Sequence, residues 1–170
     1  FTTRPDTLFG ATYLVLSPEH ELTKKISTNK SEILRYIEDS SSKNDIQRLD
    51  LTKDKTGVFT GSYAINPVNN KKIPIWIADY VLVSYGTGAI MAVPGHDERD
   101  FEFAKKYKIH IEMVVSKSEN LEVSDEPLFE DGYCVNSEFL NGLTTNQAKS
   151  KIITWLEENS YGKKEVNFRL

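Results

Sequence analysis

The sequence predicts a single domain in which a β-rich middle is flanked by helices. Residues 57–83 carry β signals throughout, and Ile73, Ile75 and Ile77 alternate with other residues as on a strand. Helical patterns lie before this stretch, between residues 17 and 51, and after it, from residue 97 and from residue 144. The length of 170 residues is that of one domain with a sizeable core.

Composition and charge exclude several classes of protein. No apolar run approaches the roughly 20 residues of a membrane span, so we expect no membrane partner. The single cysteine, Cys134, excludes an internal disulfide and fits a reducing compartment such as the cytoplasm. Three scattered histidines and one cysteine do not make a zinc site, so we expect no metal. The net charge of −4 implies that if RNA is a partner, most of the binding affinity comes from outside this domain.

The N-terminal third is predicted to run strand, turn, strand and then short helices. Phe1 to Thr3 has the pattern of a strand end, and residues 4–7 are predicted as a turn, since Pro5 biases Arg4 toward extended geometry and Asp6 favours turns. Gly10 to Leu16 is predicted as a strand. Helical patterns follow from Pro18, from Ser31 and around residues 46–51, with a polar loop predicted at residues 39–44.

After the β-rich middle, the predicted elements alternate between strand and helix. They are a strand at 89–93, a helix from Asp97, a strand at 109–115, an acidic loop at 119–131, a short extended piece at 133–135, and a helix capped by Thr144 and ended by Gly162. Val166, Phe168 and Leu170 alternate as on a strand. Because both ends are predicted as strand pieces, we expect a fragment excised from a longer chain, with its two ends close together.

The stretch from Tyr85 to Tyr107 combines a buried strand, a Pro94-Gly95 turn and a charged helix start, an arrangement that holds side chains rigidly. Asp97 is typical of a helix N-cap, and Asp100 occupies the third helical position, as in a capping box. The two carboxylates share one helix face and can bind a metal or an ammonium group. Alternatively, both only complement the helix N-terminus.

The opening threonines and the glycine pair are the other candidates for chemistry. Thr2, Thr3 and Thr7 carry hydroxyls that can position water or a ligand, although hydroxyls without a base are poor nucleophiles. A purely structural role as strand and turn residues is the alternative. Gly86-Thr87-Gly88 is a weak signal that fits a turn or bulge as well as a ligand contact. No Ser-His-Asp or Cys-His pairing stands out in the sequence.

These stretches resemble the editing domain of leucyl-tRNA synthetases of the bacterial or organellar type. The matching segments are TTRPDTLFGATY at 2–13, YGTGAIMAVPGHDERD at 85–100, TGVFTG at 56–61 and IWIADY at 75–80. In the isoleucyl and valyl relatives, TTRP continues with residues other than Asp6 and Thr7, which favours the leucyl type. The resemblance covers nearly the whole chain and is looser after Lys117.

The resemblance implies an α+β fold with a β-barrel-like core and flanking helices. It implies one editing domain, residues 1–170, inserted in a larger class I synthetase that ligates leucine to tRNA-Leu with ATP and Mg²⁺ at a separate synthetic site. The compartment would be the cytoplasm, or an organelle if the parent is an organellar enzyme. The rest of the synthetase chain is then a partner.

The implied activity is deacylation, which is the hydrolysis of the ester between a noncognate amino acid and the 3′-terminal adenosine of tRNA-Leu. Isoleucine, valine, methionine and norvaline are the expected misfits, and leucine is excluded sterically. One methylene supplies only about 1–3 kcal/mol of discrimination, so a second site must remove small misfits. The editing reaction implies no cofactor.

Site roles also follow from the resemblance. Asp100 is implied to bind the α-ammonium of the attached amino acid, and Thr7 to be the steric gate against leucine. Thr2 and Thr3 would place the ester or a water, so Thr2, Thr3 and Asp100 form the catalytic set. The remaining substrate-binding residues are implied to be Arg4, Tyr85, Met91, Val93, His96 and Asp97.

Two alternatives stay open. A binding module that holds the aminoacylated 3′-terminal adenosine of tRNA without cleaving it fits the acidic charge and the missing nucleophile. A free-standing editing enzyme is the other alternative, although the strand-like ends argue against it.

Overall fold

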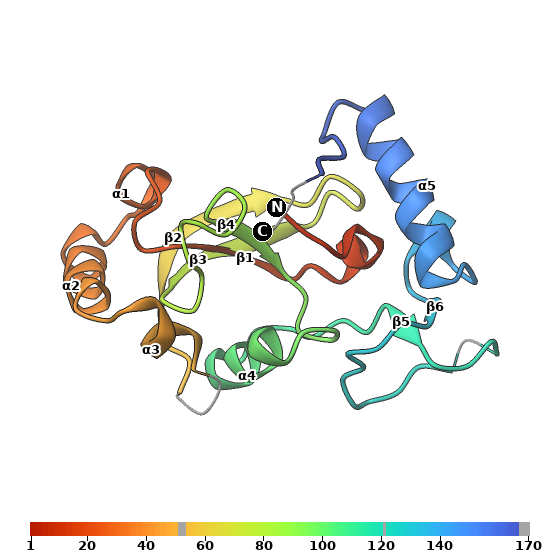
Figure 1. The fold of residues 1–170 in the computed structure, drawn as a ribbon, viewed down its shortest axis with the longest axis horizontal. Helices are drawn as coiled ribbons and strands as arrows, with labels where there is room; N and C mark the ends of the chain where they lie inside the picture. The colour runs from red at the N-terminus through yellow and green to blue at the C-terminus, as the bar shows by residue number, and fades with distance from the viewer. Residues whose placement is uncertain (51–53, 121, 167–170) are drawn as a thin grey trace.

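The computed structural model describes residues 1–50, 54–120 and 122–166 and has a mixed α+β architecture (Figure 1). A four-stranded sheet in the order β2-β3-β1-β4 lies at its centre. The strands are β1 (Tyr13–Leu16), β2 (Gly57–Ile65), β3 (Lys72–Ala78) and β4 (Ala89–Ala92). β1 is parallel to β3 and antiparallel to β4, while β2 and β3 form an antiparallel pair. The start of the chain is therefore inserted between two later strands.

Helices and a small two-stranded sheet surround the central sheet. Figure 1 shows α1, α2 and α3 gathered at one end, and α5 with β5 and β6 at the other. The 3-10 helices are η1 (Pro5–Gly10) and η2 (Glu138–Leu140). The remaining elements are α1 (Leu22–Ile26), α2 (Lys30–Ser41), α3 (Asp45–Leu49), α4 (Glu98–Tyr107), β5 (Val115–Ser116), β6 (Tyr133–Cys134) and α5 (Thr145–Glu158).

Successive side chains of a strand point to opposite faces of the sheet, and both faces are covered by other elements. On one face, Tyr13 packs with Phe103 of α4 in a buried cluster. On the other face, Ile77 packs with Ile33 of α2. A third cluster includes Ile152 of α5. The packing of Phe103 against Tyr13 holds α4 against the sheet, and the start of this helix carries the candidate site.

Several predicted elements are confirmed. The β2–β3 hairpin and the helices α4 and α5 form where the patterns indicated. Thr144 caps α5 in a reciprocal capping box with Gln147, as its sequence suggested. The helix ends at Glu158, before the predicted stop at Gly162. The predicted strand of Val166, Phe168 and Leu170 extends into residues 167–170, which lie outside the described residues.

Three local predictions were wrong. Phe1 to Thr3 is not a strand, and α2 continues to Ser41 through much of the predicted polar loop. Of the predicted strand at 109–115, only Val115 enters a strand. The backbone N–H groups of Val114 and Val115 donate to the His96 ring at 2.8 and 3.1 Å, so at Val114, outside the strand, a side chain satisfies the backbone N–H.

The α+β class with flanking helices is confirmed, while the barrel-like closure of the core is not. Within the described part of the chain, β2 and β4 are the two edges of an open sheet and do not pair with each other. Four strands are too few to close a barrel whose interior is filled by side chains. In the same part of the chain, no helix is both long and apolar enough to cross a membrane.

Candidate functional site

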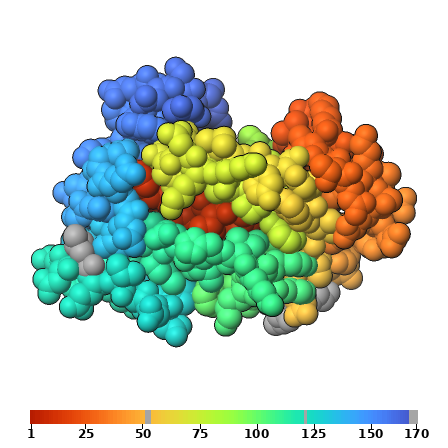
Figure 2. All heavy atoms as spheres, turned by 180° about the vertical axis from the view of Figure 1, so that it is seen from behind, coloured from red at the N-terminus to blue at the C-terminus, as the bar shows by residue number. Residues whose placement is uncertain are grey.

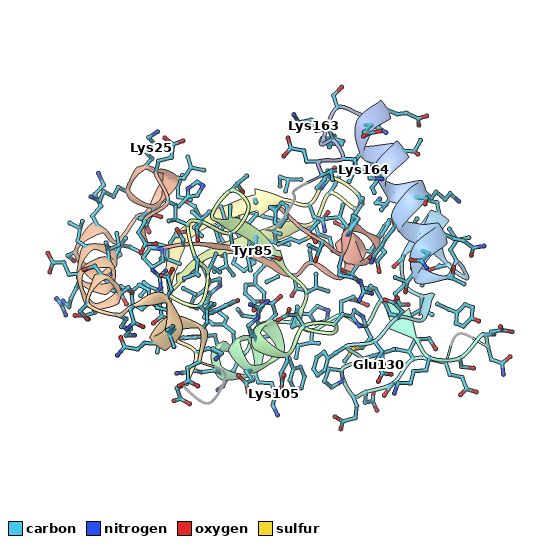
Figure 3. The ribbon with its side chains drawn as sticks, in the orientation of Figure 1. Lys25, Tyr85, Lys105, Glu130, Lys163 and Lys164 are labelled. Atoms are coloured by element: carbon cyan, nitrogen blue, oxygen red, sulfur yellow. The ribbon has the colours of Figure 1, made fainter. Side chains whose placement is uncertain are left out.

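The structure brings the opening stretch beside strand β4. The N-terminal amino group of Phe1 donates to the Ala89 carbonyl at 3.1 Å, and the Phe1 ring meets Tyr85 edge to face with centroids 5.3 Å apart. Further along, the Thr12 N–H donates to the Ala92 carbonyl at 3.2 Å. The segment that holds the predicted threonines is therefore tied to β4 at its two ends, while η1 within it packs against α5. Figure 3 shows Tyr85 near the middle of the molecule, over the sheet.

Two threonines hold the Arg4 backbone in a tight turn. Thr2 Oγ1 accepts a hydrogen bond from the Arg4 N–H at 2.9 Å, and Thr7 Oγ1 donates to the Arg4 carbonyl at 2.9 Å. Pro5 starts η1 directly afterwards, where its fixed φ fits a helix start. Thr7 is buried, with 1% of its surface exposed, whereas Thr3 is exposed. Thr3 is thus the predicted hydroxyl that is most open to a ligand.

Arg4 braces the turn through its side chain. Its guanidinium makes a forked pair with the buried Asp6, at 3.1 and 2.8 Å, and reaches Asp131 at 3.6 Å. The observed contacts of Arg4 support this loop. A contact with the terminal nucleotide of a tRNA stays a prediction.

The glycine pair forms a turn before β4, as the structural alternative held. Gly86 and Gly88 both have positive φ, 59° and 70°, which side-chain-bearing residues rarely adopt. The Gly88 N–H donates to the Tyr85 carbonyl at 3.0 Å, which closes a four-residue turn. This turn sets where β4 begins and aims Tyr85 at Phe1.

Asp97 is the N-cap of α4, as predicted. Its Oδ1 accepts hydrogen bonds from the N–H groups of Arg99 at 3.0 Å and Asp100 at 3.2 Å. Its carboxylate also pairs with the Arg99 guanidinium at 3.2 Å. The reciprocal half of the predicted capping box does not form, because the Asp100 side chain turns inward instead of back to the Asp97 N–H.

Asp100 is a buried carboxylate with both oxygens engaged. Only 4% of its surface is exposed. Oδ1 accepts from the Tyr80 hydroxyl at 2.9 Å, and Oδ2 accepts from the Val93 N–H at 2.9 Å. Burial, with a smaller contribution from Asp97, raises the pKa of this carboxyl to about 7, although the two hydrogen bonds and Arg99 act in the opposite direction. A group of this kind is a candidate for a functional role, because its charge state is balanced near neutral pH.

His96 connects the turn to the far end of the molecule. Nδ1 lies 2.7 Å from the Leu128 carbonyl and so donates to it, while Nε2 accepts from the Val114 and Val115 N–H groups. This pattern fits a neutral ring with the proton on Nδ1. Both nitrogens are therefore used by the backbone, which contrasts with the predicted substrate-binding role of His96. No local pattern indicates this arrangement, since Leu128 is distant along the chain.

We expect His96→Ala to lower the free energy of unfolding by about 2–4 kcal/mol, since it leaves two buried N–H groups and a carbonyl unpaired. His110→Ala is the matched control, because the His110 side chain is 72% exposed, and it should change stability by less than about 0.5 kcal/mol. Urea unfolding of the protein, followed by circular dichroism, measures both. Equal effects of the two substitutions would contradict the structural role of His96.

The cost of His96→Ala should also depend on pH. Burial lowers the pKa of His96, so below the unfolded value of about 6.5 the unfolded chain binds a proton that the folded protein does not. Stability from this group is complete above that pH and is lost as the pH falls. The difference between wild type and His96→Ala should therefore be smaller at pH 5 than at pH 8. A larger difference at pH 5 would contradict the neutral ring.

A hollow of the described surface lies away from these residues. A groove of about 440 Å³ opens between β2–β3 and residues 108–112, and its floor includes Phe9, Ala11 and Thr12. Figure 2 shows it as a recess with N-terminal residues, in red, at the bottom. None of the predicted site residues lines it. In the described part of the chain, no three His, Cys, Asp or Glu side chains are grouped to hold a metal ion.

Comparison with known proteins decides the family. A family model described as "Leucyl-tRNA synthetase, editing domain" matches residues 1–157. The chain belongs to the leucyl-tRNA synthetase editing-domain family. Among solved structures, it is similar to the leucyl-tRNA synthetase agnB2 of Agrobacterium radiobacter K84, which was crystallised in a ternary complex with tRNA and LeuAMS. The TM-score is 0.72 at 30% identity, and the match covers 97% of this chain and 17% of that chain.

As a leucyl-tRNA synthetase editing domain, the chain carries the family motifs at the positions described above. The TTRPDT turn at residues 2–7 and the GHDERD helix start at residues 95–100 are distant in the sequence, yet Phe1 before the turn bonds to the first residue of β4 and the helix start follows the end of β4. Two further residues are part of this arrangement and were not singled out from the sequence. They are Tyr13 and Tyr80, whose hydroxyls meet at Asp100. A buried tyrosine needs a partner for its hydroxyl, which is the one signal that points to them.

Proposed function

We propose that this domain performs post-transfer editing, which is the hydrolysis of the ester between a noncognate amino acid and the 3′-terminal adenosine of tRNA-Leu. The observation that carries the proposal is the family match over residues 1–157. It is supported by the hydrogen bonds that Phe1 and Thr12, on either side of the TTRPDT turn, make to the strand that leads into Asp97 and Asp100. The partners are the 3′ end of tRNA-Leu and the rest of a synthetase chain.

Asp100 is proposed to hold the α-ammonium of the attached amino acid. An ionised carboxylate accepts up to about four hydrogen bonds, and the Asp100 oxygens accept two from Tyr80 and Val93. A charge-assisted bond to an ammonium contributes roughly 1.5–3 kcal/mol. A bound ammonium also favours the ionised carboxylate, which opposes the effect of burial on its pKa.

The chemical step is proposed to be attack by a positioned water on the ester carbonyl. The carbonyl–oxygen bond to the ribose breaks, and the products are a free amino acid and a tRNA with a free ribose hydroxyl. Thr2 and Thr3 are proposed to orient the ester or the water. Orientation and electrostatics then supply most of the acceleration, without a covalent intermediate on the protein. The free hydroxyl of the terminal ribose is a further candidate for assisting the water.

The pocket wall is proposed to consist of Met91, Val93 and Tyr85, with Thr7 as the gate that excludes leucine. Val93 is buried and lies next to Gly10, where an added Cβ would approach Val93 Cγ1 to 3.2 Å. This close approach fixes the distance between η1, which carries Thr7, and the end of β4. No cofactor is proposed for editing, and ATP and Mg²⁺ would serve only the synthetic site of the parent enzyme.

The test is to incubate the full-length enzyme, and separately this domain, with isoleucyl-tRNA-Leu and norvalyl-tRNA-Leu. The proposal predicts that at least the full-length enzyme releases the amino acid faster than the uncatalysed rate. No release by either protein would overturn it. Binding of a nonhydrolysable aminoacyl-adenosine analogue without any turnover would favour the alternative, a module that binds the 3′ end but does not cleave.

A further inference from the structure

Two tyrosine hydroxyls converge on Asp100 inside the core. Tyr13 comes from β1, and Tyr80 comes from the turn that follows β3. Both rings are buried, and both contact the Phe103 ring, with centroids 5.5 and 5.7 Å away. The two hydroxyl oxygens lie 3.5 Å apart. Ring packing therefore holds each tyrosine in place independently of its hydroxyl.

The two hydroxyls have different partners on the same residue. The Tyr80 hydroxyl donates to the carboxylate, at 2.9 Å from Asp100 Oδ1. The Tyr13 hydroxyl donates to the backbone, at 3.0 Å from the Asp100 carbonyl oxygen. Only the Tyr80 contact therefore acts directly on the charge and the orientation of the carboxylate.

We infer that Tyr80 is a positioning residue for the editing reaction, because its hydroxyl fixes and keeps ionised the carboxylate that binds the substrate ammonium. This inference rests on the proposed function of Asp100. The Val93 N–H holds one carboxylate oxygen and Tyr80 holds the other, so the plane of the carboxylate is set from two sides. One further acceptor site on each oxygen is left for the ammonium.

The charges around Asp100 make the Tyr80 hydroxyl important for ionisation. The titratable groups that face it are Tyr13 from β1, Tyr80 from the turn after β3, and Asp97 and Arg99 from the start of α4. Burial and Asp97 favour the neutral acid, whereas Tyr80, the Val93 N–H and Arg99 favour the carboxylate. Loss of the Tyr80 hydroxyl removes one of the three contributions that favour the carboxylate, and the protonation equilibrium of Asp100 shifts toward the neutral acid.

The test compares Tyr80→Phe with Tyr13→Phe in the full-length enzyme. Each variant loses one buried hydroxyl and keeps its ring, so the two are matched for packing. The measurement is kcat/KM for deacylation of isoleucyl-tRNA-Leu from pH 5.5 to 8.5, corrected for uncatalysed hydrolysis. For Tyr80→Phe we expect a roughly tenfold loss near neutral pH and an upward shift of the acidic midpoint by about one pH unit. For Tyr13→Phe the midpoint should stay where it is in wild type.

The results separate this inference from the proposed function. If wild type does not deacylate, the proposed function fails. If wild type is active but the Tyr80→Phe profile overlays it, or Tyr13→Phe shifts the midpoint equally, the positioning role of Tyr80 is wrong. Incorporation of 3-fluorotyrosine at position 80 covers the case in which Tyr80→Phe does not fold, since it keeps the ring and makes the hydroxyl a stronger donor. It should move the midpoint to lower pH, and an unchanged or raised midpoint would overturn the inference.

Discussion

Replacing Asp100 by alanine is expected to abolish deacylation of isoleucyl-tRNA-Leu, with a loss of at least about 100-fold in kcat/KM. The change removes the proposed ammonium anchor, a contribution of roughly 1.5–3 kcal/mol, and leaves the ester without a fixed position. It also leaves the Val93 N–H and the Tyr80 hydroxyl without their buried partner, so alanine disturbs structure as well as charge. The measurement is the rate of isoleucine release by the full-length enzyme.

Asp100→Asn separates the two effects. Asparagine keeps the shape of the side chain, can accept from the Val93 N–H and can donate to the Tyr80 oxygen, yet it carries no charge. We expect the same loss of deacylation as with alanine. Because the folded pKa of about 7 lies above the unfolded value near 3.9, the native Asp100 stabilises the fold fully below the unfolded value and loses this contribution as the pH rises to 7.

Asp100→Asn should therefore be as stable as wild type, or more stable, above pH 7. Thermal unfolding at pH 8 checks this expectation. Retained deacylation in Asp100→Asn would mean that another group holds the ammonium. A large drop in stability at pH 8 would mean that the carboxylate is needed for folding and that the alanine result says little about catalysis.

Replacing Thr7 by alanine is expected to make leucyl-tRNA-Leu a substrate for deacylation. The Thr7 side chain is buried in η1 and is tied to the Arg4 carbonyl, so its position is fixed. Truncation removes a methyl and a hydroxyl from the proposed gate. A steric difference of this size changes discrimination by about 10- to 200-fold. The half-life of leucyl-tRNA-Leu in the presence of the full-length enzyme should fall accordingly.

Thr7→Val is the matched control for the gate. Valine keeps the branched volume and loses only the hydroxyl, while the Thr7 N–H still donates to the Arg4 carbonyl at 3.1 Å in the native turn. Leucyl-tRNA-Leu should therefore stay protected in Thr7→Val. An unchanged leucyl-tRNA half-life in Thr7→Ala would refute the gate role. Loss of protection in both variants would assign the discrimination to the hydroxyl rather than to bulk.

Local patterns were sufficient to predict the elements whose hydrogen bonds close within a short stretch. The β2–β3 hairpin, the cap at Asp97 and the capping box at Thr144 are of this kind. The parallel pairing of β1 with β3 could not be predicted, because no local signal specifies a partner some 60 residues away. The strand predicted at 109–115 was wrong up to Val114, whose N–H is taken by His96, a residue outside the predicted strand.

The candidate site depended on the resemblance even more than the fold did. Spacing placed Asp100 on the first turn of a helix, where an acidic residue is usually solvated or serves the helix N-terminus. In the folded protein it is buried, and its two oxygens accept hydrogen bonds from Tyr80 and Val93, which belong to other segments. The same holds for Thr7, whose burial in η1 is set by tertiary packing rather than by its neighbours in the sequence.

A crystal structure of the full-length enzyme with a nonhydrolysable isoleucyl-adenosine analogue is the most direct test of the proposed site. We predict that the α-ammonium nitrogen lies about 2.7–3.2 Å from a carboxylate oxygen of Asp100. The amino acid side chain should lie against Thr7 and Met91. An analogue bound in the groove between β2–β3 and residues 108–112, or an ammonium held by any group other than Asp100, would contradict the proposed site.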